Sequence, residues 1–484
     1  MQVPIVLNRR ARTPLHRQIY DQWRDGILAG RFAPGERVPS TRELADLLRV
    51  ARSTVATAYD QLMAEGYLQA ERGSGSFVSR ELPDVMPVRK RDAAAPDVPP
   101  PVRLSRYGTR VASATAPPTA IAGPPGSVDL SKLAPDVDAF PIRIWRRLVT
   151  RHVRALSTVA WESADRGAGH EGLRREIASY LRRTRAVRCE AGQVIVVSGS
   201  QQALDLCARV LLDPGDVAAV EDPCYPGARQ LFEAHGARLH PVPVSRDGIA
   251  VNELPDEARL VFVTPSHQLP TGASMSLPRR LELLEWARAR GVVVIEDDYD
   301  SEYHYSGAPL PALQGLSTRA SVIYVGTFSN VMFPGLRLGY LVVPPALVTA
   351  FASAKWHADR RTAILEQAAL ADFLREGHFE RHVRRMRRLY GRRRHALTTA
   401  LAKHLGDEVT VLSDAAGMFL MVRFASGRAA EQARRQGVNL TSTARFYLGP
   451  APPHEYLLRF SAVGERTLRE GIRRLAILPT AIRD

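Results

Sequence analysis

Lysine is nearly absent from this sequence. Only four of its 66 basic residues are lysines, namely Lys90, Lys132, Lys355 and Lys403. A lysine amine is a common nucleophile toward carbonyl compounds, so the chain offers few positions for that chemistry. A GC-rich genome that favours arginine codons is the simplest explanation of the imbalance.

Cysteine and long apolar runs are also scarce. The three cysteines, Cys189, Cys207 and Cys224, are odd in number and have no paired spacing. This argues against a disulfide framework or a metal site and favours free thiols in a reducing compartment. No apolar run reaches about eighteen residues, and the N-terminal MQVPIVLNRRARTP lacks the apolar core of a secretory signal. We therefore expect a cytoplasmic protein with no membrane partner.

Three regions of the 484-residue chain differ in composition. Residues 11–80 and 128–484 have regular hydrophobic patterns, whereas residues 81–127 contain ten prolines among alanines and small polar residues. Because such a segment cannot collapse into a core, we expect a flexible linker between two folded domains. The formal net charge of +16 suggests a polyanionic partner without establishing one.

Residues 11–80 carry the pattern of three helices and a β-hairpin. The first helix is expected to end at Gly30, and the second begins with Ser40 and Glu43 at the spacing of a capping box. YLQAERGSGSFVS then alternates like a hairpin. The apolar residues expected to face the core are Leu15, Ile19, Trp23, Ile27, Leu44, Leu47, Leu48, Val55, Tyr59 and Leu62. Three helices and a two-stranded wing predict a winged helix-turn-helix.

A winged helix-turn-helix places the start of its third helix in the major groove of DNA. The candidates for DNA contact are Arg42, Arg52, Ser53, Thr54, Arg72 and Gly73. Taken singly, each arginine also fits the solvated surface of a small helical interaction module. However, PLHRQIYDQWRDGILAGRFAPGERVPSTRELADLLRVARSTVATAYDQLMAEGYL resembles the DNA-binding domain of GntR-type bacterial regulators over its whole length. In that family, residues that match these six positions contact DNA.

Residues 128–484 alternate apolar strand-like runs with helical stretches. The runs are VIVVSG, VAAVEDP, RLVFVTPS, VVVIEDDYD and VIYVGTF. Between them lie stretches such as SLPRRLELLEWARARG, with Pro278 in a first turn and Gly291 at a C-cap. This pattern predicts an α/β domain with a mainly parallel sheet covered on both faces, and its ligands should bind beyond the carboxyl ends of the strands.

Polar residues follow several of these strands, and their chemistry suits a phosphorylated ring. SGSQQALDL can bind phosphate at a helix start, Arg337 can clamp phosphate, and Thr327 and Ser329 are neutral donors. Tyr225 offers a ring for stacking. The remaining groups are Asp297 for a pyridine nitrogen, Tyr299 for a ring oxygen and Arg459 for a substrate or effector carboxylate. Each residue alone is equally typical of an ordinary strand end or core, but together they indicate pyridoxal 5'-phosphate.

This region resembles a fold-type I aminotransferase, and the whole chain resembles the MocR subfamily of GntR regulators. VTPSHQLPTG, IEDDYDSEYHYSGAPLPALQG and EGHFERHVRRMRRLYGRRR strengthen the match. The resemblance implies a head-to-tail homodimer in which each DNA-binding domain lies across the large domain of its partner. It also implies a cofactor pocket formed by Ser200, Gln201, Tyr225, Asp297, Tyr299, Thr327, Ser329 and Arg337.

The chain departs from that family at the cofactor-binding lysine. The family pattern reads G-T-F-S-K, whereas this chain reads GTFSN and ends the motif with Asn330. An amide can neither bond to the cofactor covalently nor transfer a proton as the lysine amine does, so we expect transamination to be lost. Lys355 is the one lysine that we consider as a substitute. Pyridoxal phosphate could still bind non-covalently, or the pocket could favour pyridoxamine phosphate, a preformed adduct or another phosphorylated ring. The asparagine is either natural or introduced.

Residues 381–395, RHVRRMRRLYGRRRH, contain eight arginines. A solvated helix face is the simpler interpretation, and additional contact with bent DNA is the alternative.

These patterns predict a homodimeric, DNA-binding transcription regulator. Its aminotransferase-like domain would sense a pyridoxal-phosphate-type ligand, a B6 vitamer or an adduct with an amino compound, without turnover. Two alternatives stay open: an active aminotransferase fused to a DNA-binding domain, and a regulator whose large domain is only a ligand-free dimerisation scaffold.

Overall fold

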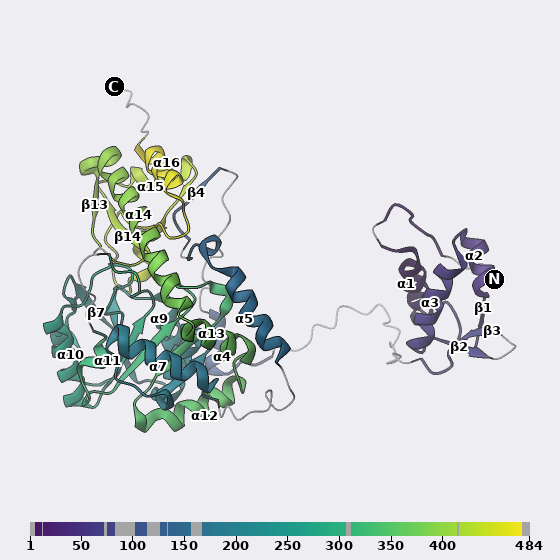
Figure 1. Ribbon diagram of the computed structural model, residues 1–484, viewed down its shortest axis with the longest axis horizontal. Helices are drawn as coiled ribbons and strands as arrows, with labels where there is room; N and C mark the ends of the chain where they lie inside the picture. The colour runs from purple at the N-terminus through teal and green to yellow at the C-terminus, as the bar shows by residue number, and fades with distance from the viewer. Residues whose placement is uncertain are drawn as a thin grey trace. The chain divides into compact units, whose positions relative to one another are not determined.

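Two units make up the chain, Met1–Val102 and Arg103–Asp484, and each is described by itself. The computed structural model (Figure 1) describes residues 5–11, 13–71, 75–82, 102–113, 126–132, 134–155, 167–305, 311–413 and 416–476.

The first unit consists of three helices and a small antiparallel sheet. The helices are α1 (Leu15–Leu28), α2 (Thr41–Leu48) and α3 (Arg52–Ala64), and the strands are β1 (Arg37–Val38), β2 (Leu68–Glu71) and β3 (Gly75–Val78). The sheet has the order β1-β3-β2, so the expected hairpin is present with one short strand added. Helix α1 ends two residues before Gly30, the end that the sequence predicted.

Most of the core of this unit follows the sequence pattern, and helix α2 contains the exception. Ser40 Oγ accepts from Glu43 N at 3.3 Å and Ser40 N donates to the Glu43 carboxylate at 2.7 Å, which confirms the capping box. Leu44 is fully buried and Leu48 is half-buried, but Leu47 is 60% exposed, so its prediction as a core residue was wrong. On the helix, Leu47 lies about 60° beyond Leu44 on the side away from Leu48, outside the buried arc. The other predicted core residues of α1 and α3 are buried, except Leu15, which is half-buried.

Part of the expected linker is helical. Helix α4 (Arg106–Ser113) lies within residues 81–127 and contacts α9 (Pro226–His235). Arg110 Nε donates to Ala234 O at 2.8 Å, and the rings of Tyr107 and His235 lie 5.1 Å apart. The expectation of a continuous flexible segment was therefore wrong for α4, because its side chains find partners on the large unit. Residues 83–101 and 114–125, which hold the ten prolines, lie outside the described residues.

An eight-stranded sheet forms the centre of the second unit. Its strands are β5 (Val194–Val197), β6 (Val217–Asp222), β7 (Arg238–Ser245), β8 (Gly248–Ile249), β9 (Ala258–Val263), β10 (Val293–Asp298), β11 (Val322–Thr327) and β12 (Gly339–Val342). The order is β5-β12-β11-β10-β9-β6-β7-β8. The neighbours from β11 to β7 are parallel, whereas β12 and β8 run antiparallel to their neighbours. All five predicted strands are present, and the mainly parallel α/β sheet is confirmed.

Helices cover both faces of this sheet, because successive strand residues point to opposite sides. On one face, α5 (Ile142–Arg154), α7 (Glu171–Arg185) and α13 (Ile364–Arg375) share a core with Val196 and Tyr324, and α10 (Leu277–Arg290) extends that side. On the other face, α8 (Ser200–Leu211), α9 and α12 (Val348–Asp359) pack over Val197 and Ile323. The cores of this sheet thus hold the strand ends in fixed positions.

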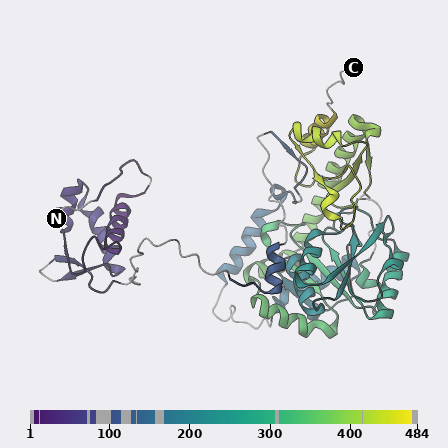
Figure 2. The same cartoon turned by 180° about the vertical axis from the view of Figure 1, so that it is seen from behind.

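A smaller antiparallel sheet lies in the C-terminal part, as Figure 2 shows from behind. Its order is β13-β14-β17-β16, and α14 (His378–Leu405) packs with α16 (Glu465–Ala476) against it. The remaining elements are β4 (Val128–Asp129), α11 (Leu313–Leu316), β13 (Val409–Val411), β14 (Phe419–Phe424), α15 (Arg428–Arg435), β15 (Val438–Asn439), β16 (Thr441–Ser442) and β17 (Glu455–Arg459). Seven short 3-10 helices are Val137–Ala139, Ala191–Gln193, Val251–Glu253, Pro334–Leu336, Pro345–Leu347, Gly406–Glu408 and Thr443–Phe446. Within the described ranges, none of the helices is both long and apolar enough to cross a bilayer.

Candidate functional site

One cavity lies beyond the carboxyl ends of the parallel strands, and we call it the strand-end cavity. It has a volume of ≈ 200 Å³ and is lined by the nine residues predicted to contact the cofactor, Asn330 included, together with Thr264 and Leu269. These residues come from the start of α8, the start of α9, the last residues of β10 and β11, and the segments that follow β9, β10 and β11. The structure therefore brings together in one place residues that are far apart in the sequence.

One end of the strand-end cavity has the features of a phosphate site. Ser200 and Gln201 begin α8, where backbone N–H groups point outward, and the preceding Gly199 has φ +97°. A Cβ added at Gly199 would lie 3.3 Å from both terminal nitrogens of Arg337, so a larger residue would crowd that guanidinium. Arg337 donates to Ser198 O at 2.7 Å, is exposed, and has φ +50° in the left-handed region. This end offers one permanent positive charge and several donors.

The middle of the cavity has the features of a site for an aromatic ring. Asp297 is 4% exposed, and its Oδ1 has no hydrogen-bond partner among the described residues. Burial, followed by the nearby carboxylates of Asp298 and Asp300, raises the pKa of Asp297 to about 7. Tyr225 lines the same space, and its hydroxyl donates to Gln201 Oε1 at 3.3 Å. An unpaired buried carboxyl group of this kind fits a protonated ring nitrogen.

The amide of Asn330 also lines the strand-end cavity. Asn330 Nδ2 donates to Tyr299 O at 3.0 Å, and Asn330 O accepts from the Tyr303 hydroxyl at 3.4 Å. Lys355 is fully buried in α12, where its Nζ lies 2.5 Å from Asp359 Oδ1. Lys355 does not line the strand-end cavity, and none of the cavity's described lining residues is a lysine. The described walls therefore present no primary amine.

Two residues with predicted roles have other contacts in the structure. The Tyr299 hydroxyl lines the cavity but donates to His267 O at 2.8 Å. Arg459, at the end of β17, does not line the cavity, and its Nη1 donates to Ser131 O at 2.6 Å. Burial lowers the pKa of Arg459 to about 10, and its Nε has no partner among the described residues. Its role toward a carboxylate stays a prediction.

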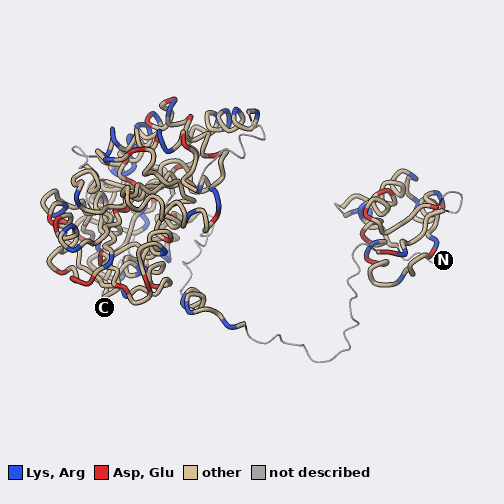
Figure 3. The backbone as a smooth tube through the Cα atoms, turned by 90° about the horizontal axis from the view of Figure 1, so that it is seen from below, with Lys and Arg blue, Asp and Glu red and all other residues tan. Residues whose placement is uncertain are grey.

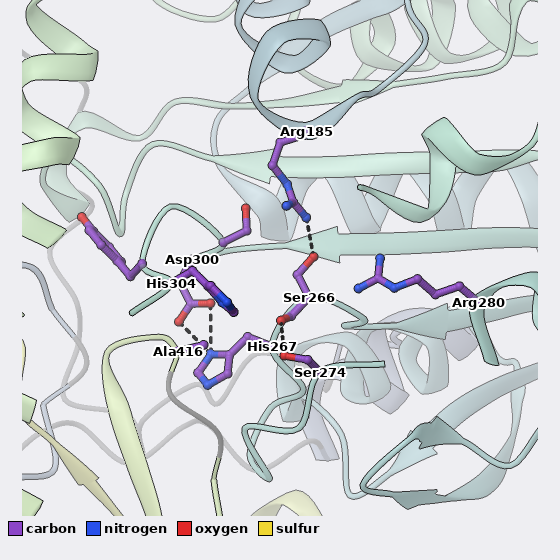
Figure 4. A pocket seen from close by; sticks show the side chains of 10 residues that line it. Arg185, Ser266, His267, Ser274, Arg280, Asp300, His304 and Ala416 are labelled. Atoms are coloured by element: carbon purple, nitrogen blue, oxygen red, sulfur yellow. Dashed lines mark hydrogen bonds and ion pairs between the residues drawn. The ribbon is translucent and has the colours of Figure 1, made fainter. Parts of the chain in front are cut away.

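A group of polar residues next to Tyr299 was not assigned from the sequence, although VTPSHQLPTG contains part of it. His267 Nδ1 lies 3.0 Å from the Asp300 carboxylate (Figure 4). The His267 ring also stacks on Phe419, with ring centroids 4.7 Å apart. These contacts fix the carbonyl that accepts from Tyr299. Figure 4 also shows Arg185 bonded to Ser266 Oγ, at 2.6 Å, beside a smaller cavity of ≈ 50 Å³.

The arginines that line the smaller cavity of Figure 4 already have partners. Arg185 forms an ion pair with Asp298 at 2.9 Å, and Arg280 donates to the carbonyls of Met275, Pro265 and Pro311. Its arginines therefore serve to hold the loops that follow β9 and β10, and they support the walls of the strand-end cavity.

In the first unit, the predicted DNA-contacting residues lie at the starts of α2 and α3. Arg42, Arg52 and Ser53 are exposed, and Thr54 is half-buried. Arg52 Nε donates to Thr41 Oγ1 at 3.3 Å, which connects the two helix starts. The predicted wing-tip residues Arg72 and Gly73 lie outside the described residues.

Comparison with known families gives two matches along the chain. Residues 15–78 match the bacterial regulatory proteins of the gntR family, and residues 139–475 match the class I and II aminotransferases. The second match covers more than half of the chain. Both functional regions described above lie within these ranges.

Relatives match nearly the whole chain. It is 41% identical over 487 residues to the probable rhizopine catabolism regulatory protein MocR of Rhizobium meliloti, covering 97% of this chain and 95% of that protein. It is 31% identical to the HTH-type pyridoxine biosynthesis transcriptional regulator PdxR of Corynebacterium glutamicum, covering 96% of each.

Solved aminotransferases match the large unit. LysN, the alpha-aminoadipate aminotransferase of Thermus thermophilus in complex with N-(5'-phosphopyridoxyl)-L-leucine, has a TM-score of 0.66 and 30% identity, covering 73% of this chain and 92% of that chain. The kynurenine aminotransferase of Pyrococcus horikoshii, in complex with PMP, has a TM-score of 0.65 and 30% identity, covering 72% and 90%. These neighbours support binding of a phosphopyridoxyl compound in general.

Proposed function

This chain belongs to the MocR-type GntR regulators, and on that premise we propose that it is a cytoplasmic, DNA-binding transcription regulator whose large unit binds a pyridoxal-phosphate-type ligand without turnover. The gntR match and the relatives named as regulators support the DNA-binding role. The aminotransferase match and the solved complexes support the ligand class.

The residues of the strand-end cavity fit pyridoxal 5'-phosphate. Arg337, Thr327, Ser329 and the start of α8 at Ser200 would hold the phosphate. Asp297, whose Oδ1 is buried without a partner among the described residues, would pair with the pyridine nitrogen. When bound, the ring would supply an electron-accepting group. Tyr225 would stack on that ring, and Tyr299 would bond to its oxygen.

One observation carries the proposal that turnover is lost. The nine residues predicted to contact the cofactor line the cavity, but position 330 among them is an amide, and none of the described lining residues is a lysine. An amide cannot act as nucleophile or base, because its nitrogen lone pair is delocalised. Lys355 is unsuitable as a substitute, since its ammonium is buried against Asp359. The ligand would therefore bind non-covalently.

The two units would work together in a head-to-tail homodimer. Residues 11–80 would bind the operator through Arg42, Arg52, Ser53, Thr54, Arg72 and Gly73. Residues 128–484 would bind the ligand and form the dimer, and residues 81–127 would connect them. Ligand binding would favour one dimer geometry and so change the spacing of the two DNA-binding domains. Arg459 would receive the carboxylate of an amino compound.

The decisive experiment is an absorption titration of the purified full chain with pyridoxal 5'-phosphate. We expect a saturable shift that dialysis reverses and no covalent product after borohydride reduction. An operator selected from random duplexes with the full chain should then change its affinity when the ligand is added. This outcome would support a regulator that binds its ligand without a covalent bond.

Two results would favour the alternatives. Conversion of any amino acid to its 2-oxo acid would show an active aminotransferase. DNA affinity and dimer geometry that are indifferent to every B6 vitamer, without any absorption change, would show a ligand-free dimerisation scaffold.

A further inference from the structure

One face of helix α5 is made almost entirely of arginine. The spacing of its arginines places them on one side of the helix: Arg143, Arg147, Arg151 and Arg154 follow at intervals of four, four and three residues, and Arg146 lies three residues after Arg143. We call these five residues the α5 arginine face. The opposite side carries the buried Trp145 and Leu148, which pack in the core shared with α13. Helix α5 is therefore firmly held, and its arginines point away from the core.

Most of these arginines have no hydrogen-bond or ion-pair partner in the part of the chain that the structure describes. All five are exposed, and together they line a groove of ≈ 560 Å³. Arg151 forms ion pairs with Asp372 and Glu376 at 2.9 and 2.6 Å, and Arg147 lies 3.8 Å from Glu376. Among the described residues, Arg143, Arg146 and Arg154 form no hydrogen bond or ion pair. Folding alone does not explain a repeated charge of this density.

The arginines of α14 are used differently, although they are more numerous. Arg385 and Arg387 donate to the carbonyls of Ala139 and Glu302, and Arg392 pairs with Glu465. Arg393 is buried and is bonded to Asp136 and Ser461. These side chains join segments of the large unit. Arg384 and Arg388 of α14 are exposed and form no hydrogen bond or ion pair with the described residues, so both interpretations of residues 381–395 stay predictions. Unpaired arginines also recur along α5, the helix at the right-hand end of the large unit in Figure 1, where Figure 3 shows blue at intervals.

We propose that the α5 arginine face binds the sugar-phosphate backbone of duplex DNA outside the site held by the winged helix. Guanidinium groups match phosphate oxygens in geometry and stay charged at every relevant pH. From Arg143 to Arg154 the helix rises about 16 Å, close to five steps of about 3.4 Å along one DNA strand. The contact goes beyond the operator contact proposed for residues 11–80.

The composition of the face favours DNA over a protein partner. The groove is lined by its five arginines, Thr150 and Ala155, without the aromatic and large apolar centre that is typical of stable protein interfaces. The exposed apolar residues Ile142 and Val153 lie at its two ends. Backbone contacts of this type depend on charge and not on base sequence, so a duplex of arbitrary sequence is a suitable probe.

The test is the salt dependence of DNA binding by the full chain. The variant carries Arg143→Gln, Arg146→Gln, Arg147→Gln and Arg154→Gln, and leaves Arg151 in place because it holds two acidic residues of the large unit. Each phosphate contact contributes about 0.9 to the slope of log affinity against log salt, so the slope for a mixed-sequence duplex should decrease by about 3 to 4. Circular dichroism and thermal unfolding should match the parent.

A matched control removes the same charge elsewhere. Arg246, Arg259, Arg428 and Arg466 are exposed, form no side-chain hydrogen bond or ion pair with the described residues, and come from different elements. Changing all four to glutamine should leave the slope nearly unchanged. An equal decrease in both variants would overturn the proposal in favour of a general effect of net charge.

A second set of variants distinguishes failure of this proposal from failure of the proposed regulator function. Arg42→Gln with Arg52→Gln removes contacts expected at the major groove, and the remaining DNA binding should decrease further when the α5 arginine face is also changed. If the parent binds DNA but its slope is equal to that of the α5 variant, the α5 proposal fails alone. If the parent binds no DNA, both proposals fail. Loss of binding to anionic phospholipid vesicles with an unchanged DNA slope would identify a membrane contact instead and would overturn the proposal.

Discussion

The two ends of the strand-end cavity differ in how they are built. The phosphate end uses backbone groups at the start of α8 and the side chain of Arg337, with Gly199 shaped to admit it. The opposite end depends on one side chain, Asn330, whose amide is occupied by a carbonyl of the cavity wall. The groups expected to bind phosphate and the amide of Asn330 thus come from different elements, so the effect of position 330 can be tested separately from phosphate binding.

Asn330→Lys should introduce a primary amine into the strand-end cavity. It should change ligand binding more than any of the other substitutions. Because the other lining residues are in place, we expect the new amine to bond covalently to pyridoxal 5'-phosphate. Mass spectrometry after borohydride reduction should change from no labelled protein to one ligand per chain. Asn330→Gln, which keeps an amide, is the control and should stay unlabelled. Labelling of the parent protein would show that another lysine acts in its place.

Asp297→Asn should affect stability and ligand binding in opposite directions. In the folded protein burial raises the pKa of Asp297 to about 7 from the ordinary 3.8, so the folded state keeps a proton that the unfolded chain releases between about pH 4 and 7. The free energy of unfolding therefore falls as pH rises through that window, by at most ~4 kcal/mol. Asparagine cannot ionise, so the ligand-free variant should be more stable than the parent above about pH 7 and nearly equal to it near pH 4.

Urea unfolding of both proteins at a series of pH values measures this difference. The same variant should bind pyridoxal 5'-phosphate more weakly, since a neutral amide does not pair with a charged ring nitrogen. Parallel pH profiles of parent and variant would contradict a raised pKa at Asp297.

Much of this organisation could be predicted because it is local in the sequence. The capping box of α2 needs only Ser40 and Glu43, and the gathering of cavity residues follows from parallel strands whose carboxyl ends meet at one edge. Predictions failed where long-range packing decides the outcome. The exposure of Leu47 depends on which side of α2 packs against α3. The helical structure of α4 depends on its contact with Ala234.

Long-range packing also explains why sequence patterns missed some residues near the strand-end cavity and left the roles of others undecided. His267 and Asp300 lie 33 positions apart and meet only in the folded unit. Arg459 comes from a strand of the smaller sheet, and its neighbours could not be inferred from LLRFSAV. Likewise, α14 and α5 are both rich in arginine, but only the contacts show which charges are already paired.

Arg337→Gln should selectively weaken binding of the ligand's phosphate group. Hydrogen bonds to a charged group contribute about 1.5–3 kcal/mol, so the affinity for pyridoxal 5'-phosphate should fall about 10- to 150-fold. The affinity for unphosphorylated pyridoxal, measured by the same fluorescence titration, should not change. Arg337→Lys keeps the charge but not the fork of donors and should give an intermediate value. An equal loss for both ligands would place Arg337 outside the phosphate site.

Replacement of Tyr225 should have the smallest effect, because stacking acts on the ring between the two ends. Tyr225→Leu removes the aromatic surface and should cost about 0.5–1.5 kcal/mol, which is roughly 2- to 12-fold in affinity for pyridoxal 5'-phosphate. Tyr225→Phe keeps the ring and loses only the 3.3 Å bond to Gln201, so its affinity should stay within about twofold of the parent. Inorganic phosphate, which has no ring, should bind all three proteins equally in a competition titration. If Tyr225→Phe loses as much affinity as Tyr225→Leu, the hydroxyl of Tyr225, and not its ring, contributes to ligand binding. Tyr225 would then act through its hydrogen bond to Gln201 at the phosphate end.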